Sequence, residues 1–307
     1  MGIAELNTRI MEIIASTAEF DNLVRDVAGK MTASYNGIKY RIPGALEITS
    51  YDELYVIGDL HGDYSTLLEF IERENILDKL EASNIVVVFL GDYIDRGPQQ
   101  LEVLATVLYL KNKYPGKIVV LRGNHEPSPM LIPIPHDFSD IVLLRYGEEG
   151  KNLLSDIYKL FQRLPYVARV PGLFLLLHGG PPRRVIDSES YEEAFSIGLP
   201  VVDDTVIEDI LWSDPIDDEN ILIEPSMRGA GVVYGPQVTR KALELAGVKF
   251  IIRGHEPVEG FLLNHMGRVV TIFDARIPNY GISRASYVKV SGEESPNDIR
   301  KVIHLIT

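Results

Sequence analysis

Side chains that could bind metal ions and transfer protons are concentrated in five short segments of this sequence. Each segment contains glycine and follows a run of apolar residues. The five are Gly58-Asp59-Leu60-His61-Gly62-Asp63, Gly91-Asp92-Tyr93-Ile94-Asp95-Arg96-Gly97, Arg122-Gly123-Asn124-His125-Glu126, His178-Gly179-Gly180 and Arg253-Gly254-His255-Glu256. Glycine lets the backbone turn sharply and leaves room for an ion or a phosphate to approach. Four of the seven histidines lie in these segments, which indicates a metal site.

Each segment by itself has an ordinary structural explanation. Asp59 to Gly62 could form a turn with an Asx cap. His178 alone could be a buried, hydrogen-bonded histidine, and Asp95-Arg96 a surface ion pair. The joint occurrence of all five, each after an apolar run, favours one shared site.

Composition narrows the chemistry and the partners. The chain has no cysteine, so any metal must bind to His, Asp, Glu or Asn side chains. A formal net charge of -14 argues against a nucleic-acid partner, because it repels phosphates over most of the surface. The first residues lack a signal-peptide pattern, and no apolar stretch is long enough to span a bilayer. We therefore expect a cytoplasmic protein without a membrane partner.

The elements that must position these segments follow from the apolar patterns. Apolar runs at 54–57, 85–90 and 118–121 alternate with amphipathic stretches at 64–75 and 99–113, which predicts a βαβαβ unit. Loops at the carboxyl ends of such strands are where sites form. The second half predicts two hairpins, 166–170 with 173–177 and 260–263 with 269–273. With 286–290 and 301–305, these strands predict a second, mostly antiparallel sheet.

Together the elements predict an α/β fold, an αββα sandwich of two mixed β-sheets flanked by helices. Helical spacing of apolar residues before the sheets predicts two packed helices in an N-terminal extension, residues 1–45. The main domain then covers residues 46–307. The segment Pro127–Pro135 carries four prolines, so we expect an irregular loop that lies beside the site.

The chain resembles the phosphoprotein phosphatase family of serine/threonine phosphatases, within the calcineurin-like metallophosphoesterases. The resemblance covers about residues 52–290. It includes the five segments and three further motifs, which are Leu211-Trp212-Ser213-Asp214-Pro215, Arg228-Gly229 with Tyr234-Gly235, and Pro278-Asn279-Tyr280. The long eukaryotic insertions are absent, which favours a prokaryotic or archaeal branch.

The resemblance implies a site with two metal ions. Asp59, His61 and Asp92 would hold the first ion. Asp92, Asn124, His178 and His255 would hold the second, so that Asp92 bridges both. Manganese is the first expectation, with iron or zinc as alternatives. Two ions sharing a carboxylate lower the pKa of a bridging water enough to give hydroxide near neutral pH.

The remaining site residues implied by the resemblance act on the substrate. The bridging hydroxide would attack phosphorus directly, without a phosphoenzyme. Arg96, Arg228 and Asn124 would bind the phosphate oxygens, and Tyr280 would lie over the site. His125 would protonate the leaving alkoxide, with Asp95 orienting it.

The expected activity is metal-dependent hydrolysis of phosphoserine and phosphothreonine monoesters in phosphoproteins or phosphopeptides, with inorganic phosphate as product. One alternative is a dinucleoside polyphosphate hydrolase acting on diadenosine tetraphosphate. Another is a non-catalytic interaction protein, which the complete set of ligands, arginines and proton donor disfavours.

The sequence departs from the family's pattern at two places, and it contains one strongly acidic stretch. The family's Ser-Ala-Pro-Asn-Tyr appears here with extra residues as 274–280, which puts the role of Tyr280 in doubt. Pro181 and Pro182 replace the family's residues after His178-Gly179-Gly180. The acidic stretch Asp203–Glu219 is by default a solvated face, and alternatively a groove wall for basic residues beside a phosphoserine.

Overall fold

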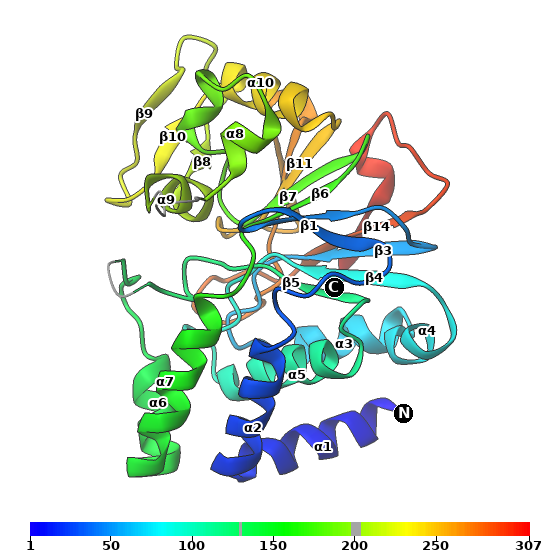
Figure 1. The fold of residues 1–307 in the computed structure, drawn as a ribbon, viewed down its shortest axis with the longest axis vertical. Helices are drawn as coiled ribbons and strands as arrows, with labels where there is room; N and C mark the ends of the chain where they lie inside the picture. Colours follow the sequence, from blue (N-terminus) through cyan, green and yellow to red (C-terminus); the bar gives the residue numbers. More distant parts are fainter. Residues whose placement is uncertain (129–130, 198–203) are drawn as a thin grey trace.

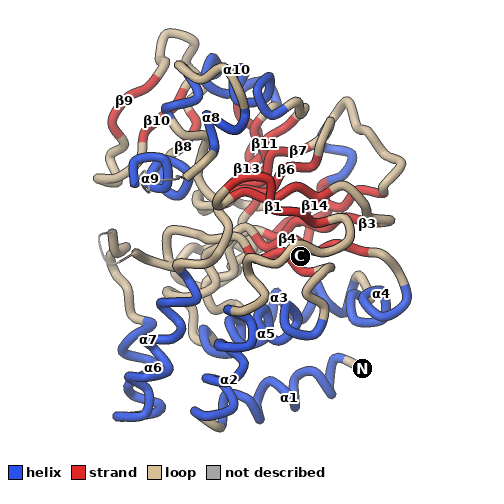
Figure 2. The backbone as a smooth tube through the Cα atoms, in the orientation of Figure 1, coloured by secondary structure: helices blue, strands red, loops and turns tan. Residues whose placement is uncertain are grey.

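Two β-sheets pack face to face in the computed structural model, and helices cover both outer faces (Figure 1). The structure describes residues 1–128, 131–197 and 204–307. Figure 2 shows the layers, with α3 (Tyr64–Arg73) and α5 (Gln100–Lys113) on one side of the sheets and α10 (Pro236–Ala246) on the other. The predicted αββα sandwich is confirmed.

The first sheet has five strands in the order β15-β14-β3-β4-β5. Its parallel part consists of β3 (Glu53–Ile57), β4 (Ile85–Phe89) and the edge strand β5 (Ile118–Val120), which are parallel as predicted. Strand β14 (Ala285–Ser291) pairs antiparallel with β3, and β15 (Ile303–Ile306) with β14. The prediction that these last two strands join the second sheet is therefore wrong. The prediction assumed that strands close in sequence lie in the same sheet. This is a tendency and not a rule.

The second sheet is mixed and has seven strands. Their order is β1 (Ile38–Ile42), β2 (Ala45–Ile48), β6 (Val167–Val170), β7 (Phe174–Leu177), β11 (Phe250–Arg253), β13 (Val269–Ile272) and β12 (Phe261–Asn264). The two predicted hairpins, β6–β7 and β12–β13, are present. However, β11 runs parallel to both β7 and β13, so the sheet is less antiparallel than predicted.

Alternate residues of the central strands face opposite layers, as the pleat of a strand requires. Leu54 and Val56 of β3 pack between the sheets, in one cluster with Leu176 of β7. Tyr55 and Ile57 face the helices instead. Strands β3, β4 and β5 therefore carry apolar residues on both faces.

Two helical layers cover the sandwich. The helices on the side of the first sheet are α1 (Ile3–Ala15), α2 (Thr17–Ala28), α3, α4 (Ile76–Ala82), α5, α6 (Phe138–Tyr146) and α7 (Gly150–Phe161). Of these, α1 lies outside α5, away from the sheet (Figure 1). The layer on the second sheet contains α8 (Tyr191–Phe195), α9 (Asp204–Trp212) and α10. Single turns of 3-10 helix lie at Gly147–Glu149, Arg183–Ile186, His265–Gly267 and Ile299–Val302. Among the described residues, no helix has both the length and the apolar composition to cross a membrane.

The two N-terminal helices form as predicted and share the main core. Ser16 ends α1, and its Oγ accepts a hydrogen bond from the Glu19 backbone N–H at 3.3 Å to start α2. The buried side chains of both helices belong to one cluster with those of α5 and α7. The predicted boundary after residue 45 falls in the β1–β2 hairpin, so residues on both sides of it build one sheet.

A small third sheet was not predicted. Its order is β8 (Asp214–Pro215), β10 (Val232–Tyr234) and β9 (Ile223–Pro225). It lies on the same side of the molecule as α9 and α10 (Figure 1). The turn between β9 and β10 carries Arg228.

Candidate active site

The five glycine-containing segments meet at one place because the strands before them end there. Strands β3, β4 and β5 run parallel in the first sheet, and β7 and β11 run parallel in the second. All six predicted metal ligands are buried, with exposed fractions of at most 6%: Asp59, His61, Asp92, Asn124, His178 and His255. The structure brings all six into one cluster.

Backbone conformation at the site is unusual. Five non-glycine residues have φ between 41° and 74°, namely His61, Asp92, Asp95, Arg96 and His255. Such left-handed residues cost free energy and concentrate at functional sites. They turn the chain sharply where the strands end, within the segments that carry the predicted metal ligands.

Two glycines allow the acidic side chains to approach the backbone closely. A Cβ atom on Gly123 would lie 2.1 Å from Asp92 Oδ1, and one on Gly254 would lie 2.0 Å from Asp59 Oδ1. Both distances are far below van der Waals contact. Glycine is therefore required here to make room for the carboxylates.

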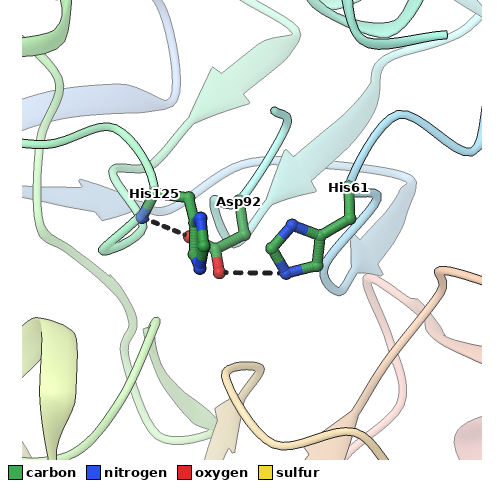
Figure 3. A group of neighbouring side chains, drawn as sticks. All are labelled: His61, Asp92 and His125. Carbon is green, nitrogen blue, oxygen red and sulfur yellow. Dashed lines mark hydrogen bonds and ion pairs between the residues drawn. The ribbon is translucent and has the colours of Figure 1, made fainter. Parts of the chain in front are cut away.

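Asp92 lies at the centre of the cluster. Its Oδ2 is 3.4 Å from Nε2 of His61 and 3.4 Å from Nε2 of His178. Its Oδ1 accepts a hydrogen bond from the backbone N–H of His125 at 2.8 Å (Figure 3). The Asp92 carboxylate thus faces imidazoles from both sheets, which is the position expected of a shared ligand.

The second predicted ligand set forms a compact group. Ligand atoms of Asp92, His178 and His255 all lie within 4.8 Å of one another. Asn124 Oδ1 lies 2.9 Å from His178 Nε2 and 2.9 Å from His255 Nδ1. This geometry agrees with the four ligands predicted for the second ion.

The first group differs from the predicted set in one member. It combines His61 and Asp92 with His125, whereas Asp59 lies slightly apart. Asp59 Oδ2 is 4.0 Å from His61 Nε2, and both Asp59 oxygens lie 3.0 Å from the backbone N–H of His255. Proximity alone therefore does not separate a ligand from the proton donor. The roles of Asp59 and His125 stay predictions.

Hydrogen bonds orient two of the imidazoles for metal binding. Nδ1 of His61 lies 2.8 Å from the Ile94 carbonyl oxygen, and Nδ1 of His178 lies 3.2 Å from that of Leu90. A carbonyl only accepts, so each Nδ1 carries a proton. Nε2 of each ring lies toward Asp92 and would offer its lone pair to a metal ion once it is deprotonated, as in known metal-binding histidines.

Burial and mutual charge perturb the ionisation of the cluster. Burial raises the pKa of Asp59 to about 7, and the Asp92 carboxylate beside it adds to the effect. Burial lowers the pKa of His61 to about 4. For His178, burial lowers the pKa, but Asp92 and Asp59 raise it to about 9. Burial alone would raise the pKa of Asp92, but the imidazoles of His178, His125 and His61 hold it well below its usual range. Asp59 is therefore the carboxylate for which the protein alone supplies too little positive charge.

The donor set fits divalent metal ions. Buried carboxylate, imidazole and amide donors without sulfur suit manganese, iron or zinc. Two groups of such donors that share Asp92 would hold two ions. A pair of cations would also neutralise the two buried carboxylates, whose proximity is otherwise unfavourable.

The predicted proton donor is paired as expected. Nδ1 of His125 lies 2.6 Å from Oδ2 of Asp95, which is fully buried. Burial by itself would lower the pKa of His125. The nearby carboxylates of Asp92 and Asp95 raise it by a larger amount, so the pKa lies above its ordinary value. Burial raises the pKa of Asp95, but hydrogen bonds from His125 and His136 lower it well below its usual range. Asp95 therefore stays ionised and keeps a proton on His125.

A cavity of about 350 Å³ opens onto the cluster. Asp92, Asn124 and His125 line it, together with the predicted substrate residues Arg96, Arg228 and Tyr280. The Tyr280 ring lies 5.7 Å from that of His61. The structure therefore places Tyr280 at the site despite the extra residues before it.

The inserted residues are accommodated by turning away from the cavity. The backbone N–H of Arg276 donates to Asp63 Oδ2 at 2.7 Å, and its side chain contacts Thr66 and Glu69 of α3. Pro181 and Pro182 are buried and do not line the cavity.

Arg228 is held by residues whose function was not predicted. Its Nε donates to Asp214 Oδ2 at 2.5 Å. Asp214 Oδ1 accepts in turn from the buried Arg253 at 3.0 Å, and Arg253 also pairs with Glu256. The motif Leu211–Pro215 contains Asp214, but its partner Arg253 is distant in sequence.

Glu126 and His136 were also missed. Buried Glu126 accepts from the backbone N–H groups of Asp92, Tyr93 and Gly123 at 2.8–2.9 Å, which joins two of the segments. Its place in the motif with Asn124 was a usable signal. His136 contacts Asp95 at 2.7 Å, and no pattern in the sequence pointed to it.

The described part of the proline-containing loop lies beside the site, as predicted. Arg96 Nη2 donates to the Ile134 carbonyl oxygen at 3.4 Å. Pro129 and Met130 lie outside the described residues.

The acidic stretch is neither a uniform solvated face nor a continuous groove wall. Asp203 lies outside the described residues. Asp209 is buried and pairs with Arg183 at 2.6 Å, while Asp214 holds Arg228. Glu219 is exposed and pairs with Arg240. Several of these carboxylates therefore form ion pairs with arginines of the same chain.

Comparison with known proteins supports a phosphoesterase. A model of the calcineurin-like phosphoesterase family matches residues 53–259, which include all five segments. A probable serine/threonine-protein phosphatase of Encephalitozoon cuniculi is 34% identical over 232 residues, covering 75% of this chain and 48% of that protein. Human serine/threonine-protein phosphatase 5 is 33% identical over 262 residues, covering 83% and 49% respectively. The chain spans about half the length of these curated relatives.

Solved structures show the same fold. A protein serine/threonine phosphatase from Saccharomyces cerevisiae, with similarity to human PP5, has a TM-score of 0.70 at 20% identity. The match covers 95% of this chain and 89% of that one. A cold-active protein tyrosine phosphatase has a TM-score of 0.57 at 18% identity, covering 80% and 75%. The fold is therefore shared by proteins named for different phosphoamino acids.

Proposed function

This chain belongs to the calcineurin-like phosphoesterases, and from that premise we propose that it is a metal-dependent protein serine/threonine phosphatase. It would hydrolyse phosphoserine and phosphothreonine monoesters of phosphoproteins and release inorganic phosphate. The names of the sequence relatives support the protein substrate.

One observation carries the proposal. The shared Asp92 carboxylate, two arginines and the His125–Asp95 pair all serve a single cavity. An acidic protein with two arginines directed at one cavity is suited to an anionic group there. A phosphate monoester supplies that anion.

Asp59, His61 and Asp92 would hold one divalent ion, and Asp92, Asn124, His178 and His255 the other. Manganese is our first proposal for both. When bound, two such ions lower the pKa of a water molecule enough to supply hydroxide at neutral pH.

The protein side chains supply binding and proton transfer. Arg96 and Arg228 bind nonbridging phosphate oxygens and stabilise the charge that develops in the transition state. A water oxygen forms the new bond to phosphorus, and the bond from phosphorus to the serine oxygen breaks. The serine oxygen takes a proton from His125 Nε2, which leaves His125 neutral. This donor matters most for a serine alkoxide, a poor leaving group.

Parallel assays test the substrate class. After chelation, the protein should release no phosphate from a phosphoserine peptide, and added manganese should restore turnover. With manganese, we expect a higher kcat/KM on the phosphoserine peptide than on diadenosine tetraphosphate or a phosphotyrosine peptide. Preference for diadenosine tetraphosphate would replace the proposal with a dinucleoside polyphosphate hydrolase.

Asp92→Asn tests the metal site itself. It keeps the shape of the side chain and removes the negative charge that both groups of ligands share. It should lose metal and lower the rate by more than the roughly 10–100-fold that loss of a ligand's hydrogen-bond partner costs, because it weakens the binding of both ions. Two bound ions and a normal rate in Asp92→Asn would show that Asp92 is not the bridge.

A further inference from the structure

Every acceptor position of the Asp95 carboxylate is occupied. Oδ1 accepts from the backbone N–H groups of Asp137 at 3.0 Å and Phe138 at 3.1 Å. Oδ2 lies 2.6 Å from Nδ1 of His125 and 2.7 Å from Nδ1 of His136. An ionised carboxylate offers about four such positions. Two histidines therefore share one oxygen of a carboxylate whose other oxygen is fixed by backbone.

The second histidine is itself fixed at both ring nitrogens. An ionised carboxylate only accepts, so His136 Nδ1 carries a proton that it donates to Asp95. His136 Nε2 lies 2.7 Å from the hydroxyl oxygen of Tyr158, which donates to it when the imidazole is neutral. Tyr158 is anchored in α7, where its ring packs against Phe161 at 6.0 Å. The His136 side chain is only 9% exposed.

The orientation of His125 depends on this arrangement. Its backbone N–H is held by Asp92, but among the described residues its ring is hydrogen-bonded through Nδ1 to Asp95 alone. Oδ2 of Asp95 therefore sets the direction in which His125 Nε2 faces the cavity. His136, itself held by Tyr158, is the other donor to that oxygen.

We propose that His136 is a positioning residue for proton transfer: together with Tyr158 it holds Asp95 so that His125 Nε2 is directed at the leaving oxygen. This inference rests on the proposed function of the site. Among the described residues, the ring of His136 is hydrogen-bonded to Asp95 and Tyr158 and to none of the predicted metal ligands, so it acts through Asp95.

The test compares leaving groups rather than overall activity. The manganese-loaded enzyme is assayed with p-nitrophenyl phosphate, phenyl phosphate and a phosphoserine peptide. In this order the leaving oxygen becomes more basic and depends more strongly on receiving a proton. His136→Ala should lose roughly tenfold in kcat on phenyl phosphate and the peptide, part of the ~10²–10⁴-fold that a proton donor contributes. The loss on p-nitrophenyl phosphate should be much smaller, with KM and manganese content unchanged.

Two conservative variants separate positioning from folding. His136→Asn keeps an N–H donor near Nδ1 and should recover most of the lost rate. Tyr158→Phe removes only the hydroxyl partner and should give an intermediate loss with the same dependence on leaving group. His304→Ala, a histidine stacked on Tyr287 on the first sheet, is the matched control and should show no such dependence.

The outcomes are distinct. Equal losses on all three substrates, or failure of His136→Asn to recover a leaving-group-dependent rate, would overturn the positioning role. A wild-type enzyme that hydrolyses both aryl phosphates but not the peptide would overturn the proposed function instead. The two aryl phosphates would then still decide the role of His136.

Discussion

At the scale of single residues, the acidic side chains of the site are held by N–H donors before any substrate binds. Backbone N–H groups of His255 and His125 hold Asp59 and Asp92, and imidazole and backbone N–H groups hold Asp95. Fixed donors of this kind need no rearrangement during the reaction. Arg228 is fixed in a similar way before substrate binds, because its Nε donates a hydrogen bond to Asp214 beside the cavity.

Arg228 gives a prediction at this scale. Arg228→Ala should weaken inhibition by inorganic phosphate and lower kcat/KM by about 10–100-fold, since a hydrogen bond to a charged group contributes about 1.5–3 kcal/mol. Phosphate inhibition constants and metal content would be measured together. Arg228→Lys should recover only part, because lysine lacks the planar fork of arginine.

Arg240 in α10 is the matched control. It is exposed and paired with Glu219, outside the cavity, so Arg240→Ala should leave phosphate inhibition unaltered. If Arg228→Ala is inhibited by phosphate as strongly as the wild type, Arg228 does not bind the phosphate.

At the scale of elements, helix α3 connects the first segment of the site to the first sheet. At its start, Asp63 accepts from the Thr66 backbone N–H at 3.0 Å, directly after His61 and Gly62. At its end, Glu74 accepts from Lys289 of β14 at 2.8 Å and from the Tyr287 hydroxyl. The helix therefore fixes the turn that carries Asp59 and His61.

Glu74 gives a prediction with a defined pH dependence. Burial by itself would raise the pKa of Glu74. Hydrogen bonds from Lys289 and Tyr287 lower it by a larger amount, so the folded-state pKa lies below the unfolded value. This stabilisation is present above the unfolded pKa of about 4.3 and is lost as pH falls through the folded-state pKa. Glu74→Gln should lower the free energy of unfolding by about 1–3 kcal/mol at pH 7.

Urea unfolding at pH 7 and at successively lower pH would measure this effect. The difference between Glu74→Gln and the wild type should shrink below pH ~4. Glu72→Gln, at an exposed position on the same helix, should cost less than about 0.5 kcal/mol. A difference for Glu74→Gln that persists unchanged in acid would mean that packing, not charge, is responsible.

At the scale of the whole molecule, the N-terminal helices are part of the main core rather than an appendage. Leu6, Ile10 and Phe20 are fully buried in one cluster with side chains of α5 and α7. Figure 1 shows α1 below α5, on the side of α5 away from the sheets, with α2 next to it. We therefore expect the helices and the sheets to unfold together.

Phe20→Ala tests this expectation. It should lower the free energy of unfolding by about 3–5 kcal/mol in a single transition, because it leaves a cavity in the shared core. Met11→Ala, in α1 but 37% exposed, is the control and should cost less than about 0.5 kcal/mol. Chemical unfolding followed by circular dichroism would show this. A separate early transition in Phe20→Ala would indicate an independent helical unit.

The central strands, their helices and the position of the site could all be predicted from local patterns in the sequence. Apolar runs such as 54–57 and 85–90 are local patterns, and each ends in a glycine turn with metal-binding side chains. Because the carboxyl ends of parallel strands meet at one edge, local patterns were enough to bring Asp59, Asp92 and Asn124 together. The cytoplasmic location stays a prediction from composition.

The pairing of residues that are distant in sequence could not be predicted and became visible in the folded chain. Strand β14 crosses to the first sheet, and His136 reaches Asp95 across 41 residues of sequence. Asp214 accepts hydrogen bonds from both Arg228 and Arg253, and Arg253 lies 39 residues after Asp214 in the sequence. Such pairings depend on how the two sheets pack and where each loop returns. A pattern of residue types along the chain carries no information about them, because it records neighbours in sequence and not neighbours in space.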